Sequence, residues 1–165
     1  LASLNWRKPD RVIAANGEGS NMSGNIVVAI DASPGSDRAI DAAMSLAGAS
    51  GVSLTLVHII EWSPFSFHTP DELAERHKRR EEELDRAKVA ILDPAADKAR
   101  AAGIKSEAVV RHGHPAETLA EIAKEQGALQ IFIGRKGQST AGALFFGSVV
   151  SSLIQISAVP VTVVP

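Results

Sequence analysis

The sequence predicts an α/β domain built on a single doubly wound parallel sheet. Short runs of β-branched and other apolar residues, such as residues 26–30 and 54–60, are typical of strands covered on both faces. Between these runs, apolar residues recur at helical spacing in segments that end at glycine. Strands that alternate with helices in this way indicate a parallel sheet with right-handed crossovers.

The first strand follows a polar, Gly/Asn/Ser-rich segment. We interpret residues 1–24 as a linker, tag or tether, and residues 25–165 as one domain, which suits a chain of 165 residues. After the strand and a turn at residues 31–36, apolar residues from Ala39 to Ala47 predict a helix that ends by Gly51. Residues 54–60 form the second predicted strand.

The second half of the chain continues the alternation. A charged segment over residues 71–102 predicts a long helix with one apolar stripe; its polar side is a solvated face or, alternatively, binds a partner. The aromatic residues before it anchor a loop on the domain or line an oligomer contact: Trp62, Phe65 and Phe67. The remaining elements are a strand at residues 105–111, a helix from Pro115 to Gly127, a strand at 129–133, a helix at 147–156 and a strand from Val159 to Val164.

Composition excludes several classes of protein. Lys and Arg number 17 and Asp and Glu number 19, so a net charge of −2 does not favour nucleic acid as a partner. The chain has no cysteine, which excludes disulfides, thiolate catalysis and Cys-based zinc sites. No apolar run approaches the roughly 20 residues of a membrane-spanning helix. We therefore expect a cytoplasmic domain without a direct membrane span.

Two polar strand ends are candidates for a binding site, because ligands of open α/β sheets bind beyond the carboxyl ends of the strands. One is Asp31–Ala32–Ser33. The other begins at Gly134 and Gly137, where we expect backbone conformations that a Cβ atom forbids and close approach of a ligand to the main chain. It continues to the start of the last helix, where backbone N–H groups form a phosphate cradle: Gly147, Ser148 and Val149.

Other interpretations of these residues stay open. Asp31 either contacts a ligand or caps the first helix, and Arg135 and Lys136 either reach phosphates or are solvated loop charges. The pair His112 and His114 lacks a third metal ligand, so ordinary loop histidines are favoured. No P-loop or dinucleotide fingerprint is present. No nucleophile–base pair is evident either, so the residues themselves predict binding and not catalysis.

The pattern Gly134-x2-Gly137-x9-Gly147-Ser148 resembles the ATP-binding signature of the universal stress proteins. Further similarity lies in the Asp-x-Ser turn at residues 31–33, in Leu56-Val57-His58-Ile59, in Gly113-His114-Pro115, and in the terminal strand. The resemblance covers about residues 24–165. It implies a five-stranded sheet of order 3-2-1-4-5 with about four helices.

The resemblance also implies a role for each site residue. Asp31 approaches the adenosine, Ile59 contacts adenine, and Ile133 and Gly134 line the sugar and base. The phosphates of ATP, or of ADP or AMP, bridged by Mg²⁺, are held by Gly137, Gly147, Ser148 and Val149. The last strand, from Val159 to Val164, pairs with its copy in a homodimer.

Our functional hypothesis is an ATP-binding regulatory module of the stress response, for which the resemblance implies at most slow hydrolysis of ATP. Its nucleotide would change the loop from Gly137 to Phe146, including Leu144 and Phe145, or an oligomer contact that a partner reads. One alternative is a nucleotide-independent homodimer that acts as a structural or chaperone-like protein. Another is the cytoplasmic regulatory tail of a membrane transporter, suggested by basic and aromatic residues near the start: Trp6, Arg7, Lys8 and Arg11.

Overall fold

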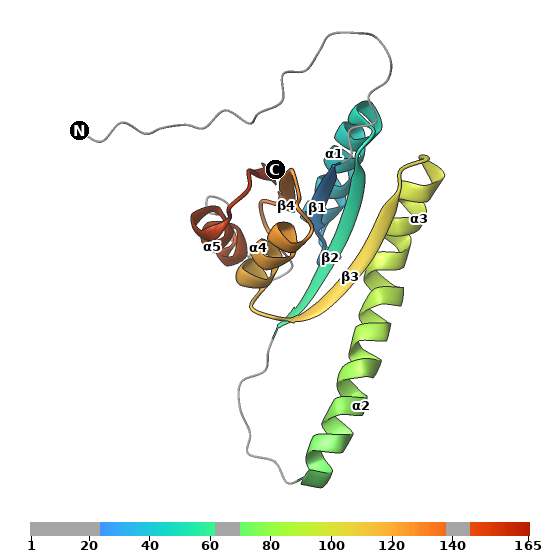
Figure 1. The fold of residues 1–165 in the computed structure, drawn as a ribbon, viewed down its shortest axis with the longest axis vertical. Helices are drawn as coiled ribbons and strands as arrows, with labels where there is room; N and C mark the ends of the chain where they lie inside the picture. The colour runs from blue at the N-terminus through green and yellow to red at the C-terminus, as the bar shows by residue number, and fades with distance from the viewer. Residues whose placement is uncertain (1–23, 62–69, 138–145) are drawn as a thin grey trace, which may run out of the picture.

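The computed structural model describes residues 24–61, 70–137 and 146–165. Five parallel strands form one sheet in the order β3-β2-β1-β4-β5, which confirms the predicted order (Figure 1). The central strand β1 pairs with both β2 and β4, so the strand order reverses at β1 and β4. The strands are β1 (Asn25–Ala29), β2 (Ser53–Glu61), β3 (Ser106–Gly113), β4 (Gln130–Gly134) and β5 (Val161–Val164).

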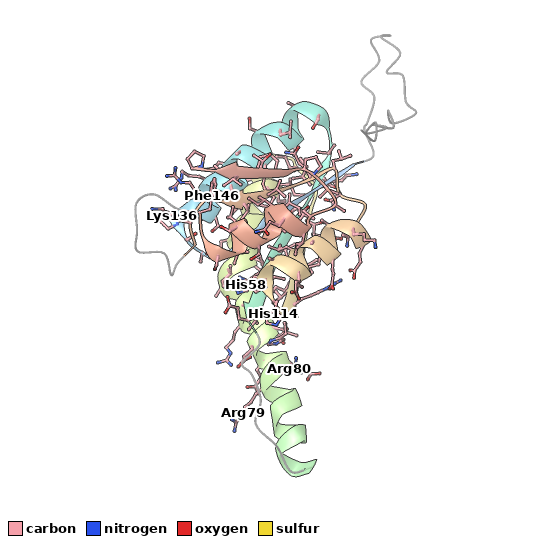
Figure 2. All side chains as sticks on the ribbon, turned by 90° about the vertical axis from the view of Figure 1, so that its left-hand side faces the viewer. His58, Arg79, Arg80, His114, Lys136 and Phe146 are labelled. Atoms are coloured by element: carbon pink, nitrogen blue, oxygen red, sulfur yellow. The ribbon has the colours of Figure 1, made fainter. Side chains whose placement is uncertain are left out.

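Helices cover both faces of the sheet. A π-helical turn, η1 (Lys88–Leu92), joins α2 (Pro70–Ala87) to α3 (Asp93–Ala101), so the predicted long helix is one continuous helical segment that ends before Gly103. The lower part of α2 projects beyond the sheet, and it carries Arg79 and Arg80 (Figures 1 and 2). The other helices are α1 (Pro34–Ser50), α4 (Pro115–Glu125) and α5 (Ser148–Ile156).

Two apolar layers hold the helices to the sheet. Ile26 and Val28 of β1 point into the layer under α1 and α3, whereas Val27 points into the layer under α4 and α5. All three side chains are at most 1% exposed. Full burial of a residue of this size stabilises the fold by about 1.5–3 kcal/mol. Because β1 is buried on both sides, its unbroken apolar sequence is what its position requires.

Helix α1 begins directly after the turn that follows β1. The Ser33 hydroxyl accepts a hydrogen bond from Ser36 N–H at 3.2 Å, which makes Ser33 the N-cap, and Pro34 occupies the first helical position. At the other end, Gly51 has a φ of 72°, and its N–H donates to Ala47 O at 2.8 Å. Ser33, and not Asp31, therefore caps the N-terminus of α1.

Helix α4 is fixed to the end of β3. A side chain at Gly113 would collide with the Thr118 hydroxyl, so the first turn of α4 lies close against the strand end. At the last turn, Arg111 donates to Glu125 Oε2 at 2.5 Å, and this bond lowers the pKa of the exposed Glu125 carboxyl. These contacts hold in place the helix that carries Leu119.

The last strand is shorter than the sequence predicts. Strand β5 begins at Val161, because Val159 lies in a turn in which its N–H donates to Ser157 Oγ at 3.2 Å. Pro160 has no N–H for a strand ladder, although its carbonyl accepts from Ile131 N–H at 2.9 Å.

The first turn of α1 lies directly on the end of β4, backbone against backbone. A Cβ atom built on Gly134 would lie 2.5 Å from the Gly35 carbonyl carbon, and one built on Gly35 would lie 2.5 Å from Lys136 O. Among the described residues, positive φ angles do not occur at Gly134 or Gly137. The expectation of unusual backbone conformations at these two glycines was therefore wrong; close approach is what Gly134 permits, and α1 is what approaches it.

This contact predicts opposite effects for two Gly→Ala substitutions. Gly134→Ala forces apart two backbones and should lower the free energy of unfolding by about 1–3 kcal/mol. Gly48→Ala, in α1, meets no atom within 4 Å and should raise it by about 0.5–1 kcal/mol. Urea denaturation of both variants and the wild type measures the difference. Equal stability of the two variants would contradict the assigned contact.

Candidate functional site

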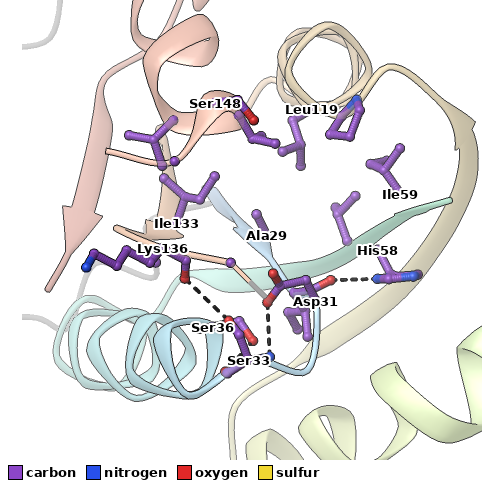
Figure 3. Close-up of a pocket in the computed structure, with 18 of the residues that line it drawn as sticks. Ala29, Asp31, Ser33, Ser36, His58, Ile59, Leu119, Ile133, Lys136 and Ser148 are labelled. Atoms are coloured by element: carbon purple, nitrogen blue, oxygen red, sulfur yellow. Dashed lines mark hydrogen bonds between the residues drawn. The ribbon is translucent and has the colours of Figure 1, made fainter. Parts of the chain in front are cut away.

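A cavity of about 260 Å³ opens at the carboxyl edge of the sheet, where the strand order reverses. Its wall is formed by the β1–α1 turn, the end of β2, α4, the end of β4 and the start of α5 (Figure 3). The site residues predicted from the sequence all line this one cavity: Asp31, Ile59, Ile133, Gly134, Gly137, Gly147, Ser148 and Val149. Their contacts with a ligand stay predictions.

One side of the cavity is apolar. Ile59 of β2, Leu119 of α4 and Ile133 of β4 come from three separate elements and converge on the same space (Figure 3). Leu119 and Ile133 are largely buried, at 2% and 7% exposed, and Ile59 is half-buried. An apolar wall with a few polar groups is the usual character of a small-molecule site, and it suits a flat aromatic group.

The opposite side is formed by the turn after β1. Ser33 N–H donates to Asp31 Oδ1 at 3.0 Å, which closes an Asx turn around Ala32. Ala32 has a φ of 59°, a left-handed conformation that is unfavourable for a residue with a Cβ atom. A Cβ atom on Gly137 would lie 2.5 Å from Asp31 Oδ2. Glycine at this position therefore leaves room for the Asp31 carboxylate.

Three helices begin at the cavity, α1, α4 and α5, and they differ in how their first N–H groups are satisfied. Helix α4 begins with Pro115, which has no N–H, and carries Glu117 in its first turn. Helix α1 is capped by the Ser33 hydroxyl. The N-cap of α5 is Gly147, which has no side chain to accept from the first turn. The N–H groups at the start of α5 have no partner within the helix, and the residues that carry them, Ser148 and Val149, line the cavity. The prediction of a free N–H at Gly147 was wrong, because this group donates to Arg135 O at 3.1 Å. Such a helix end favours an anion.

The basic residues after β4 do not point into the cavity. The Lys136 side chain extends away from it (Figure 3), and its carbonyl accepts a long hydrogen bond from Ser33 Oγ at 3.5 Å. Arg135 is exposed and is not among the lining residues. Asp31 and Glu61 are the carboxylates of the lining. Lys136 is a lining residue, but its side chain is directed away from the cavity, so the structure favours loop charges over phosphate contacts for both basic residues.

Several lining residues were missed by sequence reasoning. His58 and Glu61 lie at the end of β2, and the imidazole Nδ1 of His58 is 2.7 Å from the Ile30 carbonyl oxygen. Ser36, from the start of α1, and Leu119 also line the cavity, as does Ser33, which belongs to the candidate strand end predicted from the sequence. The available signal was position: these residues follow a strand end, or sit one helical turn inside the next helix, at the switch point.

Other sequence hypotheses concern residues away from the cavity. His114 is exposed, and His112 Nε2 is buried without a hydrogen-bond partner. No group of three His, Cys, Asp or Glu residues able to hold a metal ion occurs in the described part of the chain. The tail with Trp6, Arg7, Lys8 and Arg11, the residues Trp62, Phe65 and Phe67, and the residues Leu144 and Phe145 lie outside the described residues; Phe146 is 51% exposed.

A helix crosses a membrane only if it is long and apolar enough to span the hydrocarbon core. Within residues 24–61, 70–137 and 146–165, none of the helices has both the length and the apolar character needed to cross a membrane.

Comparisons with known proteins agree with this fold. A family model described as the Universal stress protein family matches residues 22–165. The universal stress protein YxiE of Bacillus subtilis is 29% identical over 150 residues, which cover 87% of this chain and 99% of that protein. Among solved structures, the universal stress protein UspA from Lactobacillus plantarum has a TM-score of 0.70 at 21% identity, covering 86% of this chain and 97% of its own.

Structural neighbours include complexes with ligands. A universal stress protein crystallised in complex with cAMP has a TM-score of 0.56 at 28% identity, covering 86% of this chain and 96% of its own. The strand order, the position of the cavity and the family model, which spans most of the sequence, lead to the same conclusion. The chain belongs to the universal stress protein family.

Proposed function

We propose that this chain is a regulatory module that binds an adenine nucleotide, ATP with Mg²⁺ or else ADP or AMP, in the cavity at the switch point. The observation that carries the proposal is the pairing, in one cavity, of an apolar wall with the uncapped start of α5. The related protein in complex with cAMP supports this ligand class. The site residues named from the sequence have the roles that follow.

The apolar wall would hold the base. The ladder between β1 and β2 ends at Ala29 and Val57, yet β2 continues to Glu61. Strand β1 therefore ends before it could pair with Ile59. The backbone edge of Ile59 that faces the β1 side is left without a ladder partner, and Ile59 lines the cavity. A flat base would lie between Ile59, Leu119 and Ile133, and it would form hydrogen bonds with the backbone groups on this edge of Ile59. Asp31 and Gly134 would lie beside the sugar.

The start of α5 would hold the phosphates. Backbone N–H groups of Ser148 and Val149, the Ser148 hydroxyl, and close approach at Gly137 and Gly147 suit an anion without requiring a lysine. The cavity also contains two carboxylates, and the side chain of the lining residue Lys136 extends away from it, so bound Mg²⁺ would supply positive charge beside the phosphates. Phosphate oxygens, and not protein side chains, would be its principal ligands.

The backbone of Arg135 would communicate nucleotide occupancy to the edge of the sheet. Gly147 N–H, at the start of α5, donates to Arg135 O at 3.1 Å, and Arg135 N–H donates to Val164 O at 2.7 Å. A phosphate that draws the start of α5 toward itself therefore acts on β5 through one residue. We propose that β5 is the surface whose contacts the nucleotide regulates, through a homodimer.

Nucleotide binding is tested by a pair of substitutions at one position. Ser148→Pro removes one N–H group at the first helical position, where proline is tolerated; the preceding Gly147 has a ψ of 157°, which suits a residue before proline. Titration calorimetry with Mg²⁺–ATP should show binding about tenfold weaker or more. Ser148→Ala keeps the N–H group and isolates the contribution of the hydroxyl.

Adenosine, which has no phosphate, is the control ligand and should bind Ser148→Pro and wild type equally. A wild-type protein, freed of any nucleotide carried through purification, that binds none of ATP, ADP, AMP and cAMP would overturn the proposal in favour of the nucleotide-independent homodimer. Phosphate release measured on the same samples reports whether the bound ATP turns over.

The homodimer is tested at β5, whose backbone groups alternate in direction. The carbonyls of Pro160 and Val164 accept hydrogen bonds from β4. Because backbone groups alternate in direction along a strand, the N–H groups of Val161 and Val163 point away from β4, to the open edge of the sheet. Val163→Pro removes an outward N–H group and should convert the dimer to a folded monomer. Thr162→Pro removes a bond to β4 and should instead destabilise the fold.

Light scattering measures the mass of both variants, and urea denaturation measures their stability. A wild-type protein that is monomeric at all concentrations, or a Val163→Pro variant that dimerises as wild type does, would contradict pairing through β5.

A further inference from the structure

The structure shows how β1 leaves the sheet at the edge of the cavity. The last β1–β2 register pair is Ala29 and Val57, and one more backbone bond follows, from Ile30 N–H to Val57 O at 2.8 Å. In a continuing parallel ladder, the Ile30 carbonyl would next accept from Ile59 N–H. Instead the imidazole Nδ1 of His58 lies 2.7 Å from this carbonyl oxygen (Figure 3).

This contact determines which nitrogen of His58 carries a proton. A carbonyl oxygen only accepts, so Nδ1 is the donor and is protonated. His58 is half-buried and lines the cavity, and the bond spans from one strand to the end of its neighbour. The side chain therefore takes the place of a backbone donor at the point where the ladder stops.

Two parts of the proposed nucleotide site depend on where the ladder stops. The Ile30 carbonyl immediately precedes Asp31 and the left-handed Ala32, so a bond that fixes it also fixes the Asx turn closed by Ser33 N–H. With the Ile30 carbonyl satisfied by the imidazole, β1 can turn away into α1. The backbone edge of Ile59 is then left at the cavity wall.

We propose that His58 is a positioning residue of the nucleotide site. Its Nδ1–H group ends the β1–β2 ladder at Ile30, and it thereby orients Asp31 and keeps the backbone edge of Ile59 open to a ligand. This role rests on the proposed function and deepens it. His58 acts through the Ile30 carbonyl and not through contact with the nucleotide.

The experiment compares side chains that differ in where they place a donor. In asparagine the amide nitrogen is as far from Cβ as Nδ1 is in histidine, whereas in glutamine it is one bond farther. With Mg²⁺–ATP as the probe, we expect His58→Leu and His58→Gln to bind about tenfold more weakly than wild type, and His58→Asn to bind within about twofold of it. His114→Leu, which removes an exposed histidine outside the cavity, should bind as wild type does.

Two measurements distinguish a positioning role of His58 from a purely structural one: the stability of each variant, and whether His58→Asn restores the affinity that His58→Leu loses. The urea midpoints of all variants are measured. If His58→Leu does not fold, the affinities of His58→Asn and His58→Gln for Mg²⁺–ATP are compared instead. Wild-type affinity in His58→Leu or His58→Gln overturns the proposal. So does an Asn variant that folds but binds as weakly as His58→Leu.

A measurement without nucleotide distinguishes failure of this inference from failure of the proposed function. Long-range ¹H–¹⁵N correlation spectra of the ligand-free protein should show a protonated Nδ1 at His58, and the Ser33 amide should exchange faster in His58→Leu than in wild type or His58→Asn. An unprotonated Nδ1, or unchanged exchange at Ser33, overturns the positioning role even if the wild type binds no nucleotide.

Discussion

The backbone contact between Gly35 and Gly134 is the constraint on which the cavity depends. It brings the first turn of α1, which follows β1, against the end of β4, the strand on the other side of the switch point. Both chain segments turn away from the sheet here, and neither could do so this closely with a side chain between them. The Asp31 turn and the Gly137 backbone then meet, and Asp31 Oδ2 occupies the space that a side chain at Gly137 would need.

The three glycines of the sequence motif consequently have three different physical roles. Gly134 permits packing of two backbones, Gly137 leaves space for a carboxylate, and Gly147 begins a helix without providing a cap. In the proposed complex, the start of α5 at Gly147 would hold the phosphates, and Gly137 would also let a phosphate approach the backbone. The motif spacing and the shape of the cavity are linked because the first two glycines build the wall beside which α5 begins. Glycines in such a motif can therefore serve close packing of the backbone and formation of a binding site at the same time.

The sequence was sufficient for the features that depend on local patterns. Apolar periodicity predicted the alternation of strands and helices, glycine predicted the end of the long helix at Gly103, and the resemblance predicted the strand order. The start of β5 was missed, because the turn at Ser157 that excludes Val159 depends on a side-chain bond. His58 and Glu61 were missed for a longer-range reason. Whether the end of β2 borders a cavity depends on where its neighbour β1 stops, which is a property of strand register and not of either segment alone.

The starts of the helices at the cavity explain how a site with little positive charge can favour one orientation of an anionic ligand. Helices α1, α4 and α5 all start there, and each helix dipole would attract a phosphate. Helix α4, however, begins with Pro115, which has no N–H, and carries the acidic Glu117 in its first turn. The first turn of α1 is already satisfied by the Ser33 hydroxyl, and the Asp31 carboxylate stands beside it, so an anion there would lose donors and meet a like charge. The start of α5 has neither obstacle, because Gly147 supplies no cap and Lys136 directs its charge elsewhere. Orientation in the proposed complex therefore follows from which helix start has no side-chain cap, no proline and no carboxylate in its first turn, and backbone donors, unlike lysine side chains, keep that preference at any pH at which the fold is stable.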